Sequence, residues 1–138
     1  MKIVLDASVV AKWFIEEADM EKAIEIRDKF VRGEIEVLVP SLLIYELGNV
    51  FLKHPAKNSK DVENDFKALF DIGMEIVEIN KPEILRDIHK NAKHFGITFY
   101  DAVYVTLALK EGCKLITADK KLKRKAWLSC YENPLYCT

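Results

Sequence analysis

The sequence predicts an α/β fold, a three-layer α/β/α sandwich with a central parallel sheet. Two observations support this prediction: short β-branched segments alternate with amphipathic segments along the chain, and most of the glycines fall where an amphipathic segment ends. The 138 residues, half of them hydrophobic and 31% charged, are enough to build one core. We therefore treat residues 1–138 as a single domain.

Four short segments rich in β-branched residues are predicted to form the strands. They span residues 2–5, 35–39, 75–79 and 114–117, and residues 128–131 are a further candidate. Because helices separate these segments, the strands should pair in parallel through right-handed crossovers. Such connections place helices on both faces of the sheet.

The segments between the strands predict the helices. Residues 20–32 show the pattern, since their apolar residues recur at three- and four-residue spacing with charged residues between them. The other predicted helices begin near Val9 or span residues 41–53, 61–72, 83–95, 101–111 and 120–126. Four of them are followed by a glycine, and a proline lies at two of the passages from strand to helix: Gly33, Gly73, Gly96, Gly112, Pro40 and Pro82.

Composition excludes several classes of protein. With 21 Lys and Arg against 22 Asp and Glu, the net charge of −1 gives no overall attraction for nucleic acid, although the average can hide a patch. Cys113, Cys130 and Cys137 form neither a C-x-x-C pair nor a Cys/His cluster, which indicates ordinary thiols. The longest uncharged stretch, residues 37–45, is shorter than the ~20 residues of a membrane-spanning helix. Asp6 interrupts the apolar start before a secretory signal could form, so we expect a cytoplasmic protein.

Two acidic residues occupy positions where parallel sheets build their sites, and a third begins a helix. Asp6 directly follows the first strand and Asp119 lies two residues beyond the fourth, at the edge where ligands bind in such folds. Asp101 begins a helix three residues after Thr98. Each acid has an alternative role as a helix cap, and the sequence alone favours capping and chemistry about equally.

Glu46 has no such alternative, because it lies inside the helix 41–53, which is apolar on nearly every side. An unpaired carboxylate in that setting is costly and needs a cation or hydrogen bonds. On its own helix the nearby polar group is Asn49, at i+3 on the same face. We therefore expect a metal ion, or a basic group from another segment, as its counter-charge.

Carboxylates that converge at one crevice repel each other unless divalent cations neutralise them. An all-oxygen site suits Mg²⁺ or Mn²⁺ rather than zinc. Such ions activate water and stabilise the oxygens of an in-line displacement at phosphorus. The four acids together predict phosphodiester hydrolysis.

Four segments in the same order resemble the PIN-domain ribonucleases, and within them the VapC-type toxins of toxin–antitoxin pairs. These segments are IVLDASVV at residues 3–10, PSLLIYELGNVF at 40–51, TFYDAVYVTLA at 98–108 and LITAD at 115–119. The resemblance implies an acidic metal site made of Asp6, Glu46, Asp101 and Asp119. It also implies that the Thr117 hydroxyl supports the site, with Ser8 and Asn49 as polar neighbours.

The same resemblance implies partners. It implies an endoribonuclease that acts on RNA, a homodimer, and a small VapB-type antitoxin whose C-terminal segment places an Arg or Lys among the acids. Gly48, inside an apolar helix, would allow a close helix contact either in such a dimer or within the chain.

Five basic residues follow Asp119 almost without interruption: Lys120, Lys121, Lys123, Arg124 and Lys125. A charge run of this kind is often a solvated helix face. Because it adjoins a predicted phosphate-cleaving site, RNA binding is about equally favoured.

Other functions fit the sequence less well. A phosphatase or phosphotransfer enzyme would need a second aspartate near Asp6, and the isolated glycines make no nucleotide-binding loop. Two alternatives remain. One is a PIN nuclease of RNA processing. The other is a noncatalytic RNA-binding or protein-interaction module on the same fold, which the presence of all four acids argues against.

Overall fold

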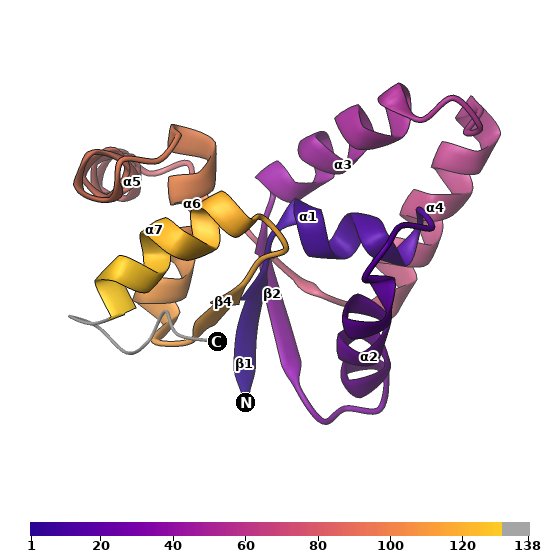
Figure 1. The fold of residues 1–138 in the computed structure, drawn as a ribbon, viewed down its shortest axis with the longest axis horizontal. Helices are drawn as coiled ribbons and strands as arrows, with labels where there is room; N and C mark the ends of the chain where they lie inside the picture. The colour runs from indigo at the N-terminus through magenta and orange to yellow at the C-terminus, as the bar shows by residue number, and fades with distance from the viewer. Residues whose placement is uncertain (131–138) are drawn as a thin grey trace.

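The computed structural model describes residues 1–130 and contains a four-stranded, fully parallel sheet (Figure 1). Its strands are β1 (Lys2–Leu5), β2 (Glu36–Pro40), β3 (Glu75–Val77) and β4 (Lys114–Ile116), in the spatial order β3-β2-β1-β4. The predicted parallel sheet is confirmed, and the central strand β1 pairs with both β2 and β4. The first strand is therefore joined to the last.

Helices lie on both sides of this sheet, which confirms the three-layer sandwich (Figure 1). One side carries α1 (Ala7–Val10), the 3₁₀ turn η1 (Ala11–Trp13), α2 (Met20–Val31), α3 (Leu42–Lys53) and α4 (Ser59–Ile72). The other side carries α5 (Pro82–Phe95), α6 (Phe99–Glu111) and α7 (Lys120–Cys130). Among the described residues, no helix is long and apolar enough to cross a membrane.

The core is built on the two central strands. Residues Ile3, Val4 and Leu5 of β1 are almost fully buried, because β1 has a strand on each side and a helical layer on each face. Helix α6 is buried along residues 102–108, since it packs against the sheet on one side and against α5 on the other. Asp101, at its start, is thereby held on a rigid element.

Helix ends follow the predicted signals. Gly96 and Gly112 end α5 and α6 with φ angles of +62° and +60°, a conformation that favours glycine. Helix α4 begins at Ser59, two residues before the predicted start, because Asn58 and Asp61 form a capping box.

The candidate strand at residues 128–131 is wrong as far as the structure describes it. Helix α7 continues through Cys130, and Tyr131 lies outside the described residues. Lysine, arginine, alanine and leucine are good helix formers, and residues 120–128 consist almost entirely of them. Once Asp119 has started the helix, these residues extend it.

Candidate active site

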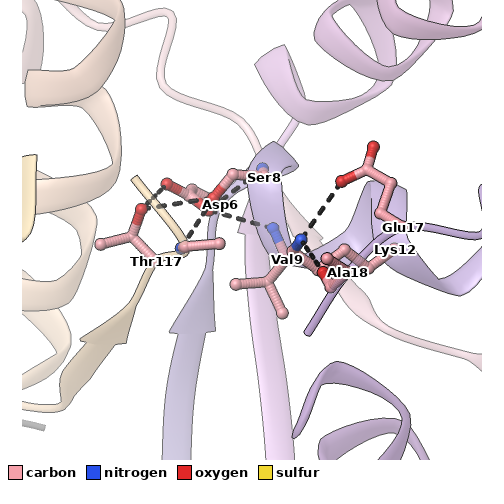
Figure 2. A network of polar contacts seen from close by, with 8 residues as sticks. Asp6, Ser8, Val9, Lys12, Glu17, Ala18 and Thr117 are labelled. Atoms are coloured by element: carbon pink, nitrogen blue, oxygen red, sulfur yellow. Dashed lines mark hydrogen bonds and ion pairs between the residues drawn. The ribbon is translucent and has the colours of Figure 1, made fainter. Parts of the chain in front are cut away.

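Asp6 lies at the carboxyl end of β1 with only 6% of its surface exposed, and hydroxyl groups surround it (Figure 2). Its Oδ1 accepts hydrogen bonds from the Ser8 hydroxyl (2.6 Å) and from the backbone N–H groups of Ser8 (3.1 Å) and Val9 (3.4 Å). Its Oδ2 accepts a hydrogen bond from the Thr117 hydroxyl. Asp6 is therefore the N-cap of α1, as one of its two predicted roles requires, and its carboxylate is also part of a polar cluster.

The same cluster ties the end of β1 to the loop after β4. The Ser8 hydroxyl accepts a hydrogen bond from the Ala118 backbone N–H (2.8 Å), and the Asp119 N–H donates to Thr117 Oγ1 (3.0 Å). Asp119 also caps α7, since its Oδ1 accepts from the N–H groups of Lys121 (2.9 Å) and Leu122 (3.2 Å). The predicted proximity of Asp6, Ser8, Thr117 and Asp119 is thus present.

Glu46 is half-buried on α3, and its partner comes from α6. The Tyr104 hydroxyl donates a hydrogen bond of 2.5 Å to Glu46 Oε1. The expected counter-charge was a metal ion or a basic group, whereas the partner found within the chain is a neutral phenol. Tyr104 is 1% exposed, so this hydrogen bond is shielded from bulk water.

Asp101 stands at the first turn of α6, where the Thr98 side chain caps the helix by accepting from the Asp101 N–H (3.0 Å). Thr98 therefore fulfils the capping role, and the Asp101 carboxylate interacts electrostatically with Asp6, Glu46 and Asp119. The structure therefore places the other three predicted acids close enough to Asp101 to interact with it electrostatically.

Burial and, to a smaller extent, repulsion between carboxylates disfavour the charged forms of Asp6, Glu46 and Asp101. Burial raises the pKa of Asp6 to about 6, against the lowering effect of its hydrogen bonds. Burial also raises the pKa of Glu46 and of Asp101, and repulsion from Asp101 and Asp119 respectively adds to the rise. Tyr104 has its pKa raised by burial and by Glu46, so the phenol stays protonated and acts as a donor.

An open cavity of about 450 Å³ lies beside these acids. Its lining includes two of the four predicted acids and both predicted polar neighbours, Glu46, Asp119, Ser8 and Asn49. It also includes Lys12 and Glu17, whose side chains form an ion pair with a Nζ–Oε2 distance of 3.2 Å (Figure 2). The cavity gives a substrate access to the acidic side of the sheet edge.

The donor set fits a hydrated magnesium or manganese ion. All candidate ligands are oxygen atoms, and for Asp6, Glu46 and Asp101 burial, with repulsion between carboxylates as a smaller cause, raises the pKa, so a cation would stabilise their charged forms. Among the side chains that the structure describes, no group of three or more acidic, histidine or cysteine residues is arranged to hold a metal ion by itself. Mg²⁺ keeps several waters and binds through one or two carboxylates, so it does not require three protein ligands in contact with it.

The basic cluster at residues 120–125 starts directly at this site, but its members differ. Lys120, Lys121, Lys123 and Arg124 are exposed on α7. Lys125 is half-buried, and its ammonium donates a hydrogen bond to the Gly96 carbonyl at the end of α5. Lys125 therefore has a side-chain partner within the chain, whereas the side chains of the other four have none among the described residues.

Sequence reasoning assigned no role to Tyr104 and left the Lys12–Glu17 pair unrecognised. Tyr104 lies three residues after Asp101, so helical spacing places both on one face of α6. That spacing was the available signal. Lys12 lies four residues after Ser8, but the pairing with Glu17 depends on the fold of the loop between them.

Comparison with known proteins adds independent information. The model of the family described as PIN domain matches residues 3–128 of the chain. Ribonuclease VapC3 of Pyrobaculum aerophilum is 32% identical over 128 residues, which cover 91% of this chain and 95% of that protein. Exonuclease VapC9 of the same organism is 31% identical over 108 residues, covering 71% and 73%.

Two solved structures share the fold. A crystal structure of PAE2754 from Pyrobaculum aerophilum superimposes with a TM-score of 0.67 at 24% identity, covering 91% of this chain and 84% of that one. The crystal structure of VapBC2 from Rickettsia felis, bound to a DNA fragment from its promoter, gives the same TM-score at 15% identity. It covers 90% of this chain and 92% of the matched one.

Proposed function

Because this chain belongs to the PIN domain family, we propose that it is a Mg²⁺- or Mn²⁺-dependent endoribonuclease, the toxin of a toxin–antitoxin pair. The observation that carries the proposal is the electrostatic coupling of Asp101 to Asp6, Glu46 and Asp119 beside an open cavity. Repulsion between such carboxylates destabilises the folded state, and a bound cation relieves that repulsion.

In this proposal Asp6, Glu46, Asp101 and Asp119 hold the metal, and Thr117 orients Asp6 through its hydroxyl. A bound divalent ion supplies water activation and neutralises charge on the phosphate oxygens. The chain contributes position: Ser8 and Thr117 fix both oxygens of Asp6, and Tyr104 fixes one oxygen of Glu46. Because the donors are already set, little reorganisation accompanies the reaction.

The partners follow from the relatives. The similar structure of VapBC2 supports a small VapB-type antitoxin, whose basic C-terminal residue would enter among the acids.

A homodimer would cover Tyr45 and Leu52, which are 76% and 82% exposed on α3. Gly48 does not support that dimer, since a Cβ there would point at Phe66 of α4 at 3.9 Å, within the same chain. Cleavage of cellular RNA would place the protein in the cytoplasm.

Cleavage of labelled single-stranded RNA by the purified protein tests this function. We expect cleavage with Mg²⁺ or Mn²⁺, none with EDTA, and a loss of several orders of magnitude in Asp101→Asn. Circular dichroism should show that the variant keeps its fold. Cleavage that persists in both EDTA and Asp101→Asn would rule out the proposed metal-dependent site.

Exonucleolytic cleavage is the second candidate, because one relative is named an exonuclease. A circular single-stranded RNA separates the two, since it has no end for an exonuclease to attack. We expect the circle to be opened. A circle that stays intact while the matching linear RNA is shortened from one end would favour the exonuclease.

A further inference from the structure

Lys12 is the only positively charged residue among the described residues that line the cavity beside the acids. Three lining residues carry negative charge, namely Glu17, Glu46 and Asp119. An RNA backbone that entered such a cavity would meet repulsion unless a cation faced its phosphates. Lys12 is therefore well placed to reduce this repulsion.

The side chain of Lys12 is held in place rather than solvated. Only 14% of it is exposed, and its Nζ lies 3.2 Å from Glu17 Oε2 and 3.2 Å from the Ala18 carbonyl oxygen (Figure 2). An ammonium group has three N–H donors, so these two partners leave one donor without a partner among the described residues. A lysine whose rotamer is already fixed loses little entropy when it binds an anion.

The side chain of Glu17 is more exposed than that of Lys12, so another anion can replace Glu17 in the ion pair. Its side chain is 45% exposed, so it can leave the ion pair for water at small cost, whereas Lys12 cannot follow it. A phosphate oxygen is a charged acceptor like the carboxylate of Glu17 and can replace it on the ammonium.

We propose that Lys12 is a phosphate-binding residue for RNA in the cavity and that Glu17 occupies its ammonium until RNA displaces it. This inference rests on the proposed function, because it takes the substrate to be RNA. The proposal places the phosphate contact nearest the acids on η1, the 3₁₀ turn that contains Lys12. The exposed basic residues of α7 would then serve the more distant backbone.

The alternative is that Lys12 only clamps the loop of residues 14–19 through Glu17 and Ala18. The two roles predict opposite effects of Glu17. If Glu17 competes with phosphate, removing its charge frees Lys12 and strengthens RNA binding. If the pair is only a clamp, removing either charge destabilises the protein and leaves RNA binding to other residues.

The test measures binding of a short fluorescent single-stranded RNA by anisotropy across a series of salt concentrations. All variants are made in an Asp101→Asn background with Mg²⁺ present, so that the RNA is not consumed. We expect Lys12→Gln to weaken binding roughly tenfold. The salt slope, which is the slope of the logarithm of the binding constant against the logarithm of the salt concentration, should fall in magnitude by about 0.7, the value for one phosphate contact on a single strand. We expect Glu17→Gln to strengthen binding.

Glu16→Gln is the matched control, because Glu16 is exposed in the same loop and its substitution removes the same charge. Glu17→Gln should strengthen binding several-fold more than Glu16→Gln does. Equal effects of these two variants would overturn the assignment of Lys12, and this comparison holds even if Lys12→Gln does not fold. An unchanged affinity and slope in a folded Lys12→Gln protein would overturn it as well.

The parent protein without Asp101→Asn is assayed in parallel for RNA cleavage. Failure to cleave would count against the proposed nuclease function alone. Cleavage by the parent together with unchanged binding in Lys12→Gln would count against the phosphate-binding role alone.

Discussion

The hydroxyl of Tyr104 lies 2.5 Å from Glu46 Oε1 and joins two helices whose residues are far apart in sequence. Glu46 comes from α3 on one side of the sheet and Tyr104 from α6 on the other. The hydrogen bond thus crosses the top of the sheet and fixes the carboxylate of Glu46 relative to Asp101, one turn away on α6. Tyr104 is a positioning residue for one of the proposed metal ligands.

Replacing Tyr104 by Phe removes only this hydroxyl. The hydrogen bond lowers the pKa of Glu46, so its loss raises that pKa further. We expect RNA cleavage near neutral pH to fall roughly tenfold, the value of a hydrogen bond to a charged group. The acid limb of the pH–rate profile should move to higher pH.

A purely structural role for Tyr104 would lower the melting temperature without moving the acid limb. Tyr100→Phe is the matched control, because Tyr100 is 61% exposed on the same helix. It should leave both the profile and the melting temperature unchanged.

Asp6 makes the metal-free protein less stable as pH rises. Its pKa is raised from 3.8 to about 6 by burial, so the folded state holds the proton more strongly than the unfolded state does. Stability that is present below about pH 4 is therefore lost as pH rises through about 6, by on the order of 3 kcal/mol. Asp6→Asn keeps a good N-cap and removes this loss.

Urea unfolding in EDTA between about pH 4 and pH 7 measures the effect. The free energy of unfolding should depend on pH less steeply in Asp6→Asn than in the wild type. An equally steep dependence in the variant would show that Asp6 is already ionised in the folded protein at low pH.

The basic residues of α7 should separate into two groups. Lys121 and Arg124 are exposed, so changing both to Gln should weaken RNA binding and reduce the salt slope by about 0.7 per contact. Lys125→Gln instead removes the hydrogen bond to the Gly96 carbonyl and a charge that lowers the pKa of Asp101. It should lower the melting temperature and leave the salt slope nearly unchanged.

If Lys125→Gln reduces the slope as much as the exposed pair does per residue, Lys125 contacts RNA despite its bond within the chain. Metal binding to the Lys121→Gln, Arg124→Gln double variant serves as the control. It should equal that of the wild type.

Gly48→Ala should stabilise the protein. Its added Cβ would meet Phe66 at 3.9 Å, an ordinary contact, and alanine is favoured over glycine in a helix by roughly 0.5–1 kcal/mol. Denaturant unfolding should show this gain, and light scattering should show an unchanged oligomeric state. A variant that no longer associates would place Gly48 in a contact between chains after all.

Leu52→Asp tests the proposed dimer directly. Leu52 is 82% exposed on α3, so a charge there costs the isolated chain little and would disrupt an apolar interface. Light scattering should show a dimer for the wild type and a particle of 15.9 kDa for the variant. A wild type of 15.9 kDa at tens of micromolar would refute the dimer.

Local patterns were enough to predict the framework. β-Branched residues mark the strands, and glycines such as Gly96 and Gly112 end the helices, because both signals act over a few residues. Asp6 and Asp119 could be placed at one edge because all strands are parallel. The candidate strand at 128–131 was wrong because the run of helix formers that precedes it extends α7 through Cys130.

Pairings between distant segments could not be predicted. Nothing near Glu46 in sequence indicates Tyr104, since 58 residues separate them and the contact depends on how α3 and α6 sit on opposite faces. The hydrogen bond from Lys125 to the Gly96 carbonyl could not be predicted for the same reason, because it depends on how α5 and α7 pack. Sequence could therefore indicate which side chains carry charge but not which of them are already paired.

The pairing of β1 with β4 has a consequence for the time at which the protein becomes active. Thr117 and Asp119 join Asp6 only when the last strand docks on the first, across more than 100 residues of chain. A nascent chain that has not yet cleared the ribosome through β4 has Asp6 and Ser8 but lacks Thr117, the second hydroxyl partner of Asp6, and Asp119. The ribosome must therefore translate past Asp119 before the acidic centre can form, and a nascent chain that ends earlier has Asp6 and Glu46 but no complete group of acids.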